Sequence, residues 1–155
     1  MRPCLPTLML LLVACRPAGQ PTAASSVNRA GLTRHLSAQL DRAAGDWNRG
    51  DLDAFMSDYA AESTTTYVDG RRSRHGFDFI RNNYAPRFAP GARRDSLHFE
   101  EVEVRPLSPT LALVTARFIL QRGDSTTASG PFTLVMERRS EGWKILHDHS
   151  SSDPR

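Results

Sequence analysis

Cysteine is scarce in this chain of 155 residues, which contains only Cys4 and Cys15. Both lie near the amino terminus, and Cys4 falls in a segment that has the form of a removable leader. The mature chain would keep a single thiol and could form no internal disulfide. This scarcity excludes the small disulfide-held scaffolds that are common among exported proteins, so a hydrophobic core must stabilise the fold.

A long hydrophobic run is also missing. The apolar stretch from Leu5 to Val13 is too short for a finished bilayer-spanning helix. Behind the positive charge of Arg2, it fits the apolar region of a secretory signal peptide. It ends in Leu12-Val13-Ala14-Cys15, which resembles the bacterial lipobox with cleavage just before the cysteine. The resemblance implies that Cys15 is lipidated and becomes the mature N-terminus; the alternative is an ordinary signal peptide that contains a cysteine.

These features predict the organisation of the chain. We expect residues 1–14 to be a lipoprotein signal peptide and residues 15–27, rich in Pro, Ala and Ser, to be a lipid-anchored flexible linker. Residues 28–155 are enough for one domain with a real core and too few for two. The predicted location is the cell envelope, facing the periplasm. Arg16 in place of an acidic retention residue favours the outer membrane where the cell has one.

A continuous basic stripe is absent as well. The formal net charge of +3 falls to +2 once Arg2 is removed, and Lys144 is the only lysine. The arginines form short clusters interrupted by acids, such as Arg71-Arg72, Arg93-Arg94 and Arg138-Arg139. Because a nucleic-acid interface needs a continuous basic surface, we expect no nucleic-acid partner.

The first half of the domain reads as helical. From Asn28 to Asn48, apolar residues recur at spacings of three and four, which is typical of one helical face. Gly50 is suited to end this helix, and Asp51 to cap a second one. Thr64 to Val68 predicts a strand, and the spacing from Phe77 to Tyr84 indicates a third helix.

The second half is rich in strands. Leu111 to Arg122 predicts a long strand whose even-numbered positions up to Leu120 are all apolar, whereas its odd-numbered face carries Arg117. Gly142 to Ser151 is the last predicted strand. Helices followed by antiparallel strands indicate an α+β fold, in which helices pack on one side of a curved antiparallel sheet.

Several short motifs follow one another along the chain: Trp47-Asn48-Arg49-Gly50-Asp51, Asp69-Gly70, Gly76-Phe77-Asp78-Phe79-Ile80-Arg81, Ala116-Arg117-Phe118 and Gly142-Trp143-Lys144-Ile145. Their order and spacing resemble a nuclear transport factor 2-like domain of the SnoaL-like kind. The last two blocks, with His147 and His149, are also similar to the association domain of calcium/calmodulin-dependent protein kinase. The resemblance implies a cone-shaped sheet wrapped by helices, an internal cavity and frequent homodimers. It implies no particular reaction, because members of this superfamily include both enzymes and binding modules.

The last predicted strand supplies the main candidate site. In a regular strand Trp143, Ile145, His147 and His149 share one face, because side chains alternate. Two apolar groups followed by two imidazoles indicate a strand that starts in a core and ends in a polar cavity, with Asp148 facing away. The histidines could bind a ligand, transfer a proton or chelate a metal. The sequence offers no clear third metal ligand, so we expect no metal.

Four further residues are candidates for the cavity. Arg117 either forms an ion pair or binds an anion with its planar guanidinium group, and both alternatives stay open. The resemblance implies the second, because the matching arginine of the kinase association domain lines its pocket. Trp47 and Tyr59 are expected to line the cavity because their polar atoms need partners when buried. Asp58 could act as a base, but we expect it on a helix surface.

Our leading hypothesis is an envelope lipoprotein that binds a small organic anion in an internal cavity and forms a homodimer. The residues expected to line the cavity are Arg117, His147, His149, Trp47 and Tyr59. One alternative is a cofactor-independent enzyme of the isomerase, dehydratase or hydrolase type that uses His147 or His149. The other is a homo-oligomeric assembly module with a vestigial pocket. No cofactor is expected in any of these cases.

Overall fold

A computed structural model of the protein describes residues 28–70 and 72–154. The predicted signal peptide and linker, including Cys15, lie outside the described residues. In the described part, no helix is long and apolar enough to cross a membrane.

The helical half begins with α1 (Arg29–Arg49), which is capped at both ends as its sequence predicts. The Asn28 side chain accepts a hydrogen bond from the Gly31 amide at 2.9 Å. At the other end Gly50 adopts a φ of 79°, a left-handed conformation that glycine enters without steric cost. Asp51 then caps α2 (Leu52–Met56) by accepting from the Ala54 amide at 2.9 Å.

The strands form one six-stranded sheet in the order β2-β1-β6-β5-β4-β3. β1 runs parallel to β6, and the other neighbouring pairs are antiparallel. The remaining elements, in chain order, are β1 (Thr66–Asp69), β2 (Ser73–His75), α3 (Phe77–Phe88), β3 (Ser96–Pro106), β4 (Leu111–Arg122), β5 (Ser125–Arg139) and β6 (Gly142–Ser150).

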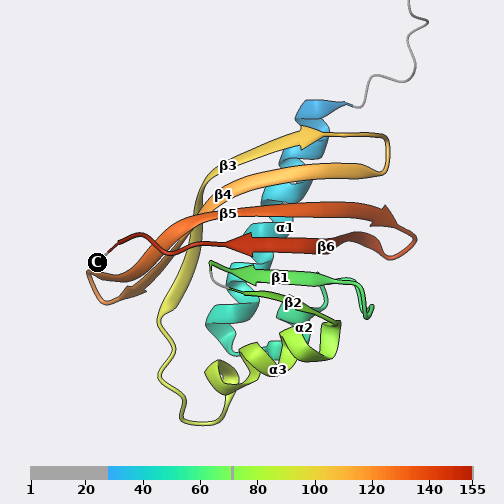
Figure 1. The fold of residues 1–155 in the computed structure, drawn as a ribbon. Coiled ribbons are helices and arrows are strands. Elements are labelled where there is room, and N and C mark those ends of the chain that lie inside the picture. Colours follow the sequence, from blue (N-terminus) through green and yellow to red (C-terminus); the bar gives the residue numbers. More distant parts are fainter. Residues whose placement is uncertain (1–27, 71, 155) are drawn as a thin grey trace, which may run out of the picture.

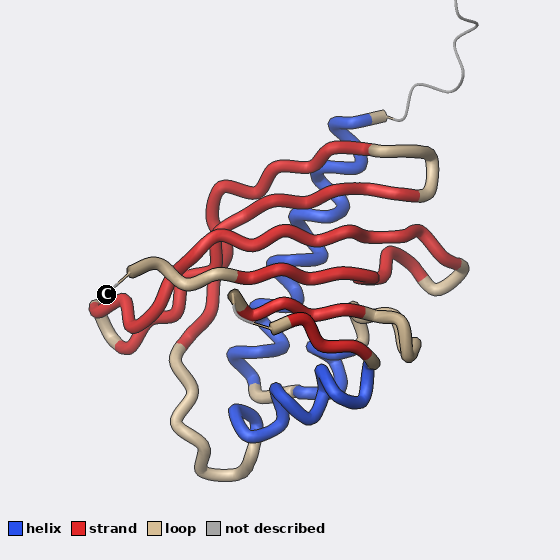
Figure 2. Tube along the Cα trace, in the orientation of Figure 1, coloured by secondary structure: helices blue, strands red, loops and turns tan. Residues whose placement is uncertain are grey.

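Helix α1 runs across one face of the sheet, and α2 and α3 lie at its β1–β2 end (Figures 1 and 2). The apolar face of β4 is buried on the helical side, where Ala112 and Val114 have no exposed surface. Leu36 and Leu40 of α1 belong to the same hydrophobic core. The predicted α+β architecture, with helices against a curved sheet, is therefore confirmed.

The sheet is irregular at three places. Its register shifts near Glu101 in β3, at Thr127 in β5 and at Leu146 in β6. An extra residue in one strand of a pair bends that strand and increases its twist. These bulges contribute to the curvature of the sheet, and the bulge in β6 decides which side chains face the helices.

Candidate functional site

A cavity of about 370 Å³ lies between the sheet and the helices. Most of its wall is apolar and aromatic, with Trp47 and Phe55 from the helices and Phe99, Phe118 and Phe132 from the strands. This volume lies near the lower end of the range for small-molecule sites, roughly 300–1,000 Å³. The cavity can therefore hold a compact, mainly apolar molecule.

One part of the cavity wall is polar and deeply buried. Asp148 of β6 is 4 % exposed, and Tyr59, which follows α2, is 5 % exposed. The Tyr59 hydroxyl donates a hydrogen bond of 2.6 Å to Oδ2 of Asp148, and the Ser150 hydroxyl donates one of 2.9 Å to Oδ1. Both carboxyl oxygens thus have a protein donor, and all three residues line the cavity.

The environment of Asp148 favours the neutral form of its carboxyl group. Burial raises the pKa of Asp148 above its ordinary value, since a charge in an apolar interior loses its hydration. The hydrogen bonds from Tyr59 and Ser150, together with charges on His147 and His149, lower the pKa but do not cancel this effect. Asp148 is therefore easier to protonate than an exposed aspartate.

Two further phenols extend this polar region. The ring of Tyr84 in α3 lies 6.4 Å from that of Tyr59 and 5.8 Å from that of Tyr67 in β1, measured between centroids. Burial, reinforced by the charge of Asp148, raises the pKa of all three tyrosines, most strongly for Tyr59 and Tyr84. These phenols stay protonated at neutral pH and present uncharged O–H groups near the cavity.

The face predicted for the last strand is correct only for its first half. Trp143 and Ile145 are buried on the inner side as expected, but Asp148 is buried there too, whereas His149 is exposed. The cause is the bulge at Leu146, where β5 pairs Met136 with Ile145 and the adjacent Val135 with His147. A one-residue irregularity in a period-two pattern exchanges the faces of all residues that follow.

The two histidines therefore lie on the outer face of the sheet and do not line the cavity. His147 contacts the Thr66 hydroxyl through Nδ1 at 2.5 Å, and its ring centroid is 6.5 Å from that of His149. Within residues 28–70 and 72–154, no group of three or more His, Cys, Asp or Glu side chains could hold a metal ion. The expectation that His147 and His149 act inside the cavity therefore does not agree with where the structure places them.

Arg117 also lies on the outer face, because its neighbours Ala116 and Phe118 in β4 face inward. Its guanidinium group forms an ion pair with Asp153, which also accepts a hydrogen bond of 2.6 Å from the Ser129 hydroxyl. The sequence left two roles open for Arg117, an ion pair or the binding of an anion, and the structure shows the ion pair. Arg117 does not line the cavity.

The two aromatic candidates, Trp47 and Tyr59, both line the cavity. The indole N–H of Trp47 donates to the Asp95 carbonyl at 2.9 Å, so its polar atom is satisfied as its burial requires. Its ring meets those of Phe55 and Phe88 edge to face, at centroid distances of 5.6 and 5.2 Å. Trp47 therefore combines a structural role with a place in the wall.

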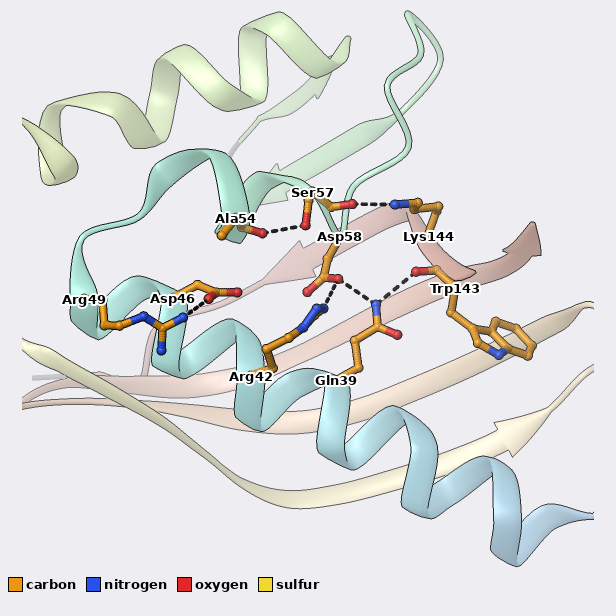
Figure 3. Close-up of polar contacts among 9 residues, drawn as sticks. All are labelled: Gln39, Arg42, Asp46, Arg49, Ala54, Ser57, Asp58, Trp143 and Lys144. Atoms are coloured by element: carbon orange, nitrogen blue, oxygen red, sulfur yellow. Dashed lines mark hydrogen bonds and ion pairs between the residues drawn. The ribbon is translucent and has the colours of Figure 1, made fainter. Parts of the chain in front are cut away.

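A second cluster of polar side chains lies between the cavity and a surface cleft of about 390 Å³. Figure 3 shows the polar contacts of this cluster. Gln39 and Asp58 line both spaces. The Gln39 amide donates to Asp58 Oδ1 and to the Trp143 carbonyl, each at 2.9 Å, and Arg42 forms an ion pair with the same carboxylate. Asp58 is only 6 % exposed, so its expected place on a helix surface is wrong. Burial raises the pKa of Asp58, although the charge of Arg42 opposes this rise.

Sequence reasoning missed Asp148 and Ser150 as cavity residues. The adjacent apolar pair Ile145-Leu146 was a signal, because strict alternation would place one of the two outside. That pair alone does not reveal whether the strand contains a bulge. The bulge is explained by a change in the segment that pairs with β6. Ile145 forms backbone hydrogen bonds with Asp58 and Ala60, whereas His147 pairs with Thr66 of β1.

Comparisons with known proteins agree with this architecture. The family described as SnoaL-like domain matches residues 36–154. A comparison with curated proteins gives no match.

Solved structures of bacterial proteins share the fold. An NTF-2 like protein of unknown function from Shewanella oneidensis MR-1 is 28% identical, with 79% of this chain and 98% of that chain covered and a TM-score of 0.64. A nuclear transport factor 2-like superfamily protein from Salmonella enterica serovar Typhimurium is 14% identical, with 81% and 94% covered and a TM-score of 0.62. A ketosteroid isomerase-like protein from Erwinia carotovora atroseptica is 18% identical, with 83% and 99% covered and a TM-score of 0.60.

Proposed function

The chain belongs to the SnoaL-like domain family, and we propose that its domain binds a small, mainly apolar organic molecule that carries a carbonyl or hydroxyl group. The observation that carries this proposal is the hydrogen-bonded pair of Asp148 and Tyr59 in the wall of an otherwise apolar cavity. Apolar walls with a few convergent polar groups are typical of small-molecule sites.

The polar groups of the cavity favour a neutral ligand over the anion expected from the sequence. Arg117 and the two histidines, which were expected to hold an anion, do not line it; Arg87 of α3 does line it but is exposed to solvent. The carboxyl groups of Asp58, Asp69 and Asp148 do line it, and they would repel an anion when ionised. A carbonyl or hydroxyl oxygen can instead accept a hydrogen bond from a phenol or from protonated Asp148.

A fluorescence titration tests this proposal. The neutral apolar dye N-phenylnaphthylamine should become brighter when it enters the cavity. Ala43→Phe should abolish the signal, because Ala43 is buried in the cavity wall and a phenyl ring would occupy the ligand space. Ala38→Phe is the matched control, since Ala38 is exposed on the same helix and lines only the surface cleft.

Competition then distinguishes the ligand class. Acetophenone, a neutral ketone, should displace the dye at lower concentration than benzoate, an anion built on the same ring. Stronger displacement by benzoate would contradict the neutral-ligand proposal and favour the anionic one. Dye binding that survives Ala43→Phe in a folded protein would show that the dye sits outside the cavity.

A second candidate function is cofactor-independent proton transfer. It is favoured by the raised pKa of Asp148, whose protonated carboxyl could donate a hydrogen bond to a carbonyl oxygen beside Tyr59. A solvent base would take the proton from the neighbouring carbon, and Asp148 would stabilise the enolate oxygen that forms. The test is deuterium exchange into the methyl group of acetophenone in heavy water, followed by NMR. Exchange that is accelerated by the wild type and lost in Asp148→Asn would support enzymatic chemistry. Exchange at the uncatalysed rate with both proteins would contradict it, and ligand binding would be the only function still supported.

We also propose that the protein is a lipoprotein of the cell envelope, anchored to the membrane through Cys15. The support is the sequence Leu12-Val13-Ala14-Cys15 behind a short apolar run. In a bacterial host, Cys15→Ala should lose metabolic labelling by a palmitate analogue, and Cys4→Ala should keep it. Labelling that persists in Cys15→Ala would refute the anchor.

We further propose a homodimer that packs through the outer face of the sheet. No helix in the described part of the chain covers this face (Figure 1), and Leu113, Ile119 and Val135 are partly exposed on it. Sedimentation velocity should show a dimer for the wild type and a monomer for Ile119→Arg. Leu107→Arg, in the exposed β3–β4 connection, should remain dimeric. A monomeric wild type would overturn this proposal.

A further inference from the structure

The chain after β6 continues as a short strap, residues 151–154, along the first half of β5. The amide of Ser151 donates to the Pro131 carbonyl at 3.0 Å, and the amide of Asp153 donates to the Ser129 carbonyl at 2.8 Å. Ser151 and Ser152 line the cavity. The strap therefore forms part of the cavity wall although it lies beyond the last strand.

The strap is fastened on the opposite face of the sheet. Asp153 forms an ion pair with Arg117 of β4 and accepts a hydrogen bond of 2.6 Å from the Ser129 hydroxyl. Its side chain is 35 % exposed and that of Arg117 is 28 % exposed, so water only partly screens the pair. The pKa of Asp153 is lowered by the hydrogen bond from Ser129 and by Arg117, which keeps the carboxylate ionised near neutral pH.

The backbone of β5 is shaped to receive the strap. A Cβ atom at Gly130 would lie 1.8 Å from the Ser151 carbonyl oxygen, closer than any side chain allows. Gly130 is buried and its φ is not in the left-handed region, so close approach explains this glycine better than an unusual backbone conformation does. The strap and β5 therefore fit each other at backbone level.

The strap is also continuous with the polar part of the cavity. Ser150, the residue just before it, donates its hydroxyl to Oδ1 of Asp148 at 2.9 Å. A displacement of the strap would move Ser150 and change the hydrogen bonding of that carboxyl group. The ion pair outside and the buried carboxyl group inside are thus connected through a few residues of chain.

We propose that Arg117 is a positioning residue of the ligand site: through Asp153 it holds residues 151–154 in place as a wall of the cavity. This inference rests on the proposed ligand-binding function, and it assigns Arg117 an indirect role without contact to the ligand. It also gives a function to an arginine that interrupts an otherwise apolar strand. Release of the strap should open the cavity and speed ligand dissociation.

The test combines two measurements on Asp153→Asn, Arg117→Ala and Arg117→Lys. NMR hydrogen exchange reads the strap directly through the amides of Ser151 and Asp153, and N-phenylnaphthylamine titration with stopped-flow dissociation reads the cavity. Arg139→Ala is the matched control. Arg139 is an arginine of the same sheet that forms ion pairs, with Glu62 and Glu137, but does not line the cavity.

Asp153→Asn and Arg117→Ala should accelerate exchange at both strap amides and weaken dye binding about threefold or more, in the range of partly exposed ion pairs. Arg117→Lys keeps the charge and should restore most of both properties, and Arg139→Ala should change neither. Unchanged exchange, or faster exchange with unchanged dye affinity and dissociation, would overturn the positioning role. A wild type that does not bind the dye would instead overturn the proposed function, and this inference with it.

Discussion

Replacing Asp148 with Asn should make the stability of the protein less sensitive to rising pH. Burial raises the folded-state pKa of Asp148 above its unfolded value, which is about 3.9. A carboxyl group with a raised folded-state pKa contributes stability that is fully present below its unfolded-state pKa. That stability is lost as pH rises through the folded-state pKa. Asparagine cannot ionise, so the free energy of unfolding of Asp148→Asn minus that of the wild type should increase with pH.

The partner of Asp148 gives this prediction a magnitude. Tyr59→Phe removes one hydrogen bond to a side chain that is 4 % exposed, so solvent cannot replace it easily. The loss should be about 0.5–1.5 kcal/mol while Asp148 is protonated and about 1.5–3 kcal/mol once it is ionised. The cost of Tyr59→Phe should therefore grow by roughly 1 kcal/mol across the titration of Asp148. In the Asp148→Asn background the cost should stay constant with pH.

Urea unfolding of the four proteins of this double-mutant cycle, from acidic to mildly alkaline pH, measures both effects. The fluorescence of Trp47 and Trp143 reports unfolding, because both indoles are buried. Asp124→Asn, on the exposed β4–β5 turn, is the control for loss of a carboxylate. A pH-independent difference between wild type and Asp148→Asn would refute the reasoning. An equal cost of Tyr59→Phe at both ends of the pH range would refute the assigned partner.

Three backbone predictions can be checked by thermal unfolding. Gly45→Ala, inside α1, should stabilise the protein by about 0.5–1 kcal/mol because alanine favours the helix; the added Cβ meets only the flexible end of Arg49, at 3.1 Å. Gly130→Ala should destabilise it by about 3 kcal/mol because of the contact with Ser151. Glu101 has a φ of 54° at the bulge of β3, so Glu101→Gly should be more stable than Glu101→Ala by about 1 kcal/mol. An effect of opposite sign would contradict the reason given for that position.

The elements that sequence predicts well are those in which local pattern and tertiary burial agree. Helix α1 has its apolar face, its cap at Asn28 and its stop at Gly50, and each is recognisable without a partner. The strand from Leu111 to Arg122 keeps an unbroken alternation through Ala112, Val114 and Ala116, which are all buried. Such consistent signals give the fold class.

The polar part of the site depends on the bulge at Leu146, and that bulge has no local cause in the sequence. It coincides with a change in pairing: Ile145 bonds to the segment from Asp58 to Ala60, and His147 pairs with Thr66 of β1. These neighbours are about eighty residues away in the chain, as the separation between Thr66 and His147 shows. A period-two pattern assumes one continuous ladder, so it assigned His147 to the cavity and Asp148 to the outside.

Arg117 illustrates a different limit. Alternation correctly places it opposite the apolar face of β4, but alternation does not say which face borders the cavity. In this domain the apolar face of β4 both forms part of the core and borders the cavity, because Ala116 is packed in the core and Phe118 lines the cavity. The partner of Arg117 is Asp153, which comes after the last strand and carries no motif. Sequence could therefore identify the ion pair as an alternative but could not choose it.

The two buried carboxyl groups that line the cavity, those of Asp58 and Asp148, are supported in different ways. Asp58 has Arg42 as an ion-pair partner, which offsets part of the cost of its burial, and a structural role is sufficient. Among the described residues, Asp148 has hydroxyl partners and no cationic side chain bonded to it, although its carboxyl group is buried as deeply. An apolar residue of similar size would avoid this desolvation cost. Stability alone thus does not explain why Asp148 faces the cavity, and the ligand site that we propose does.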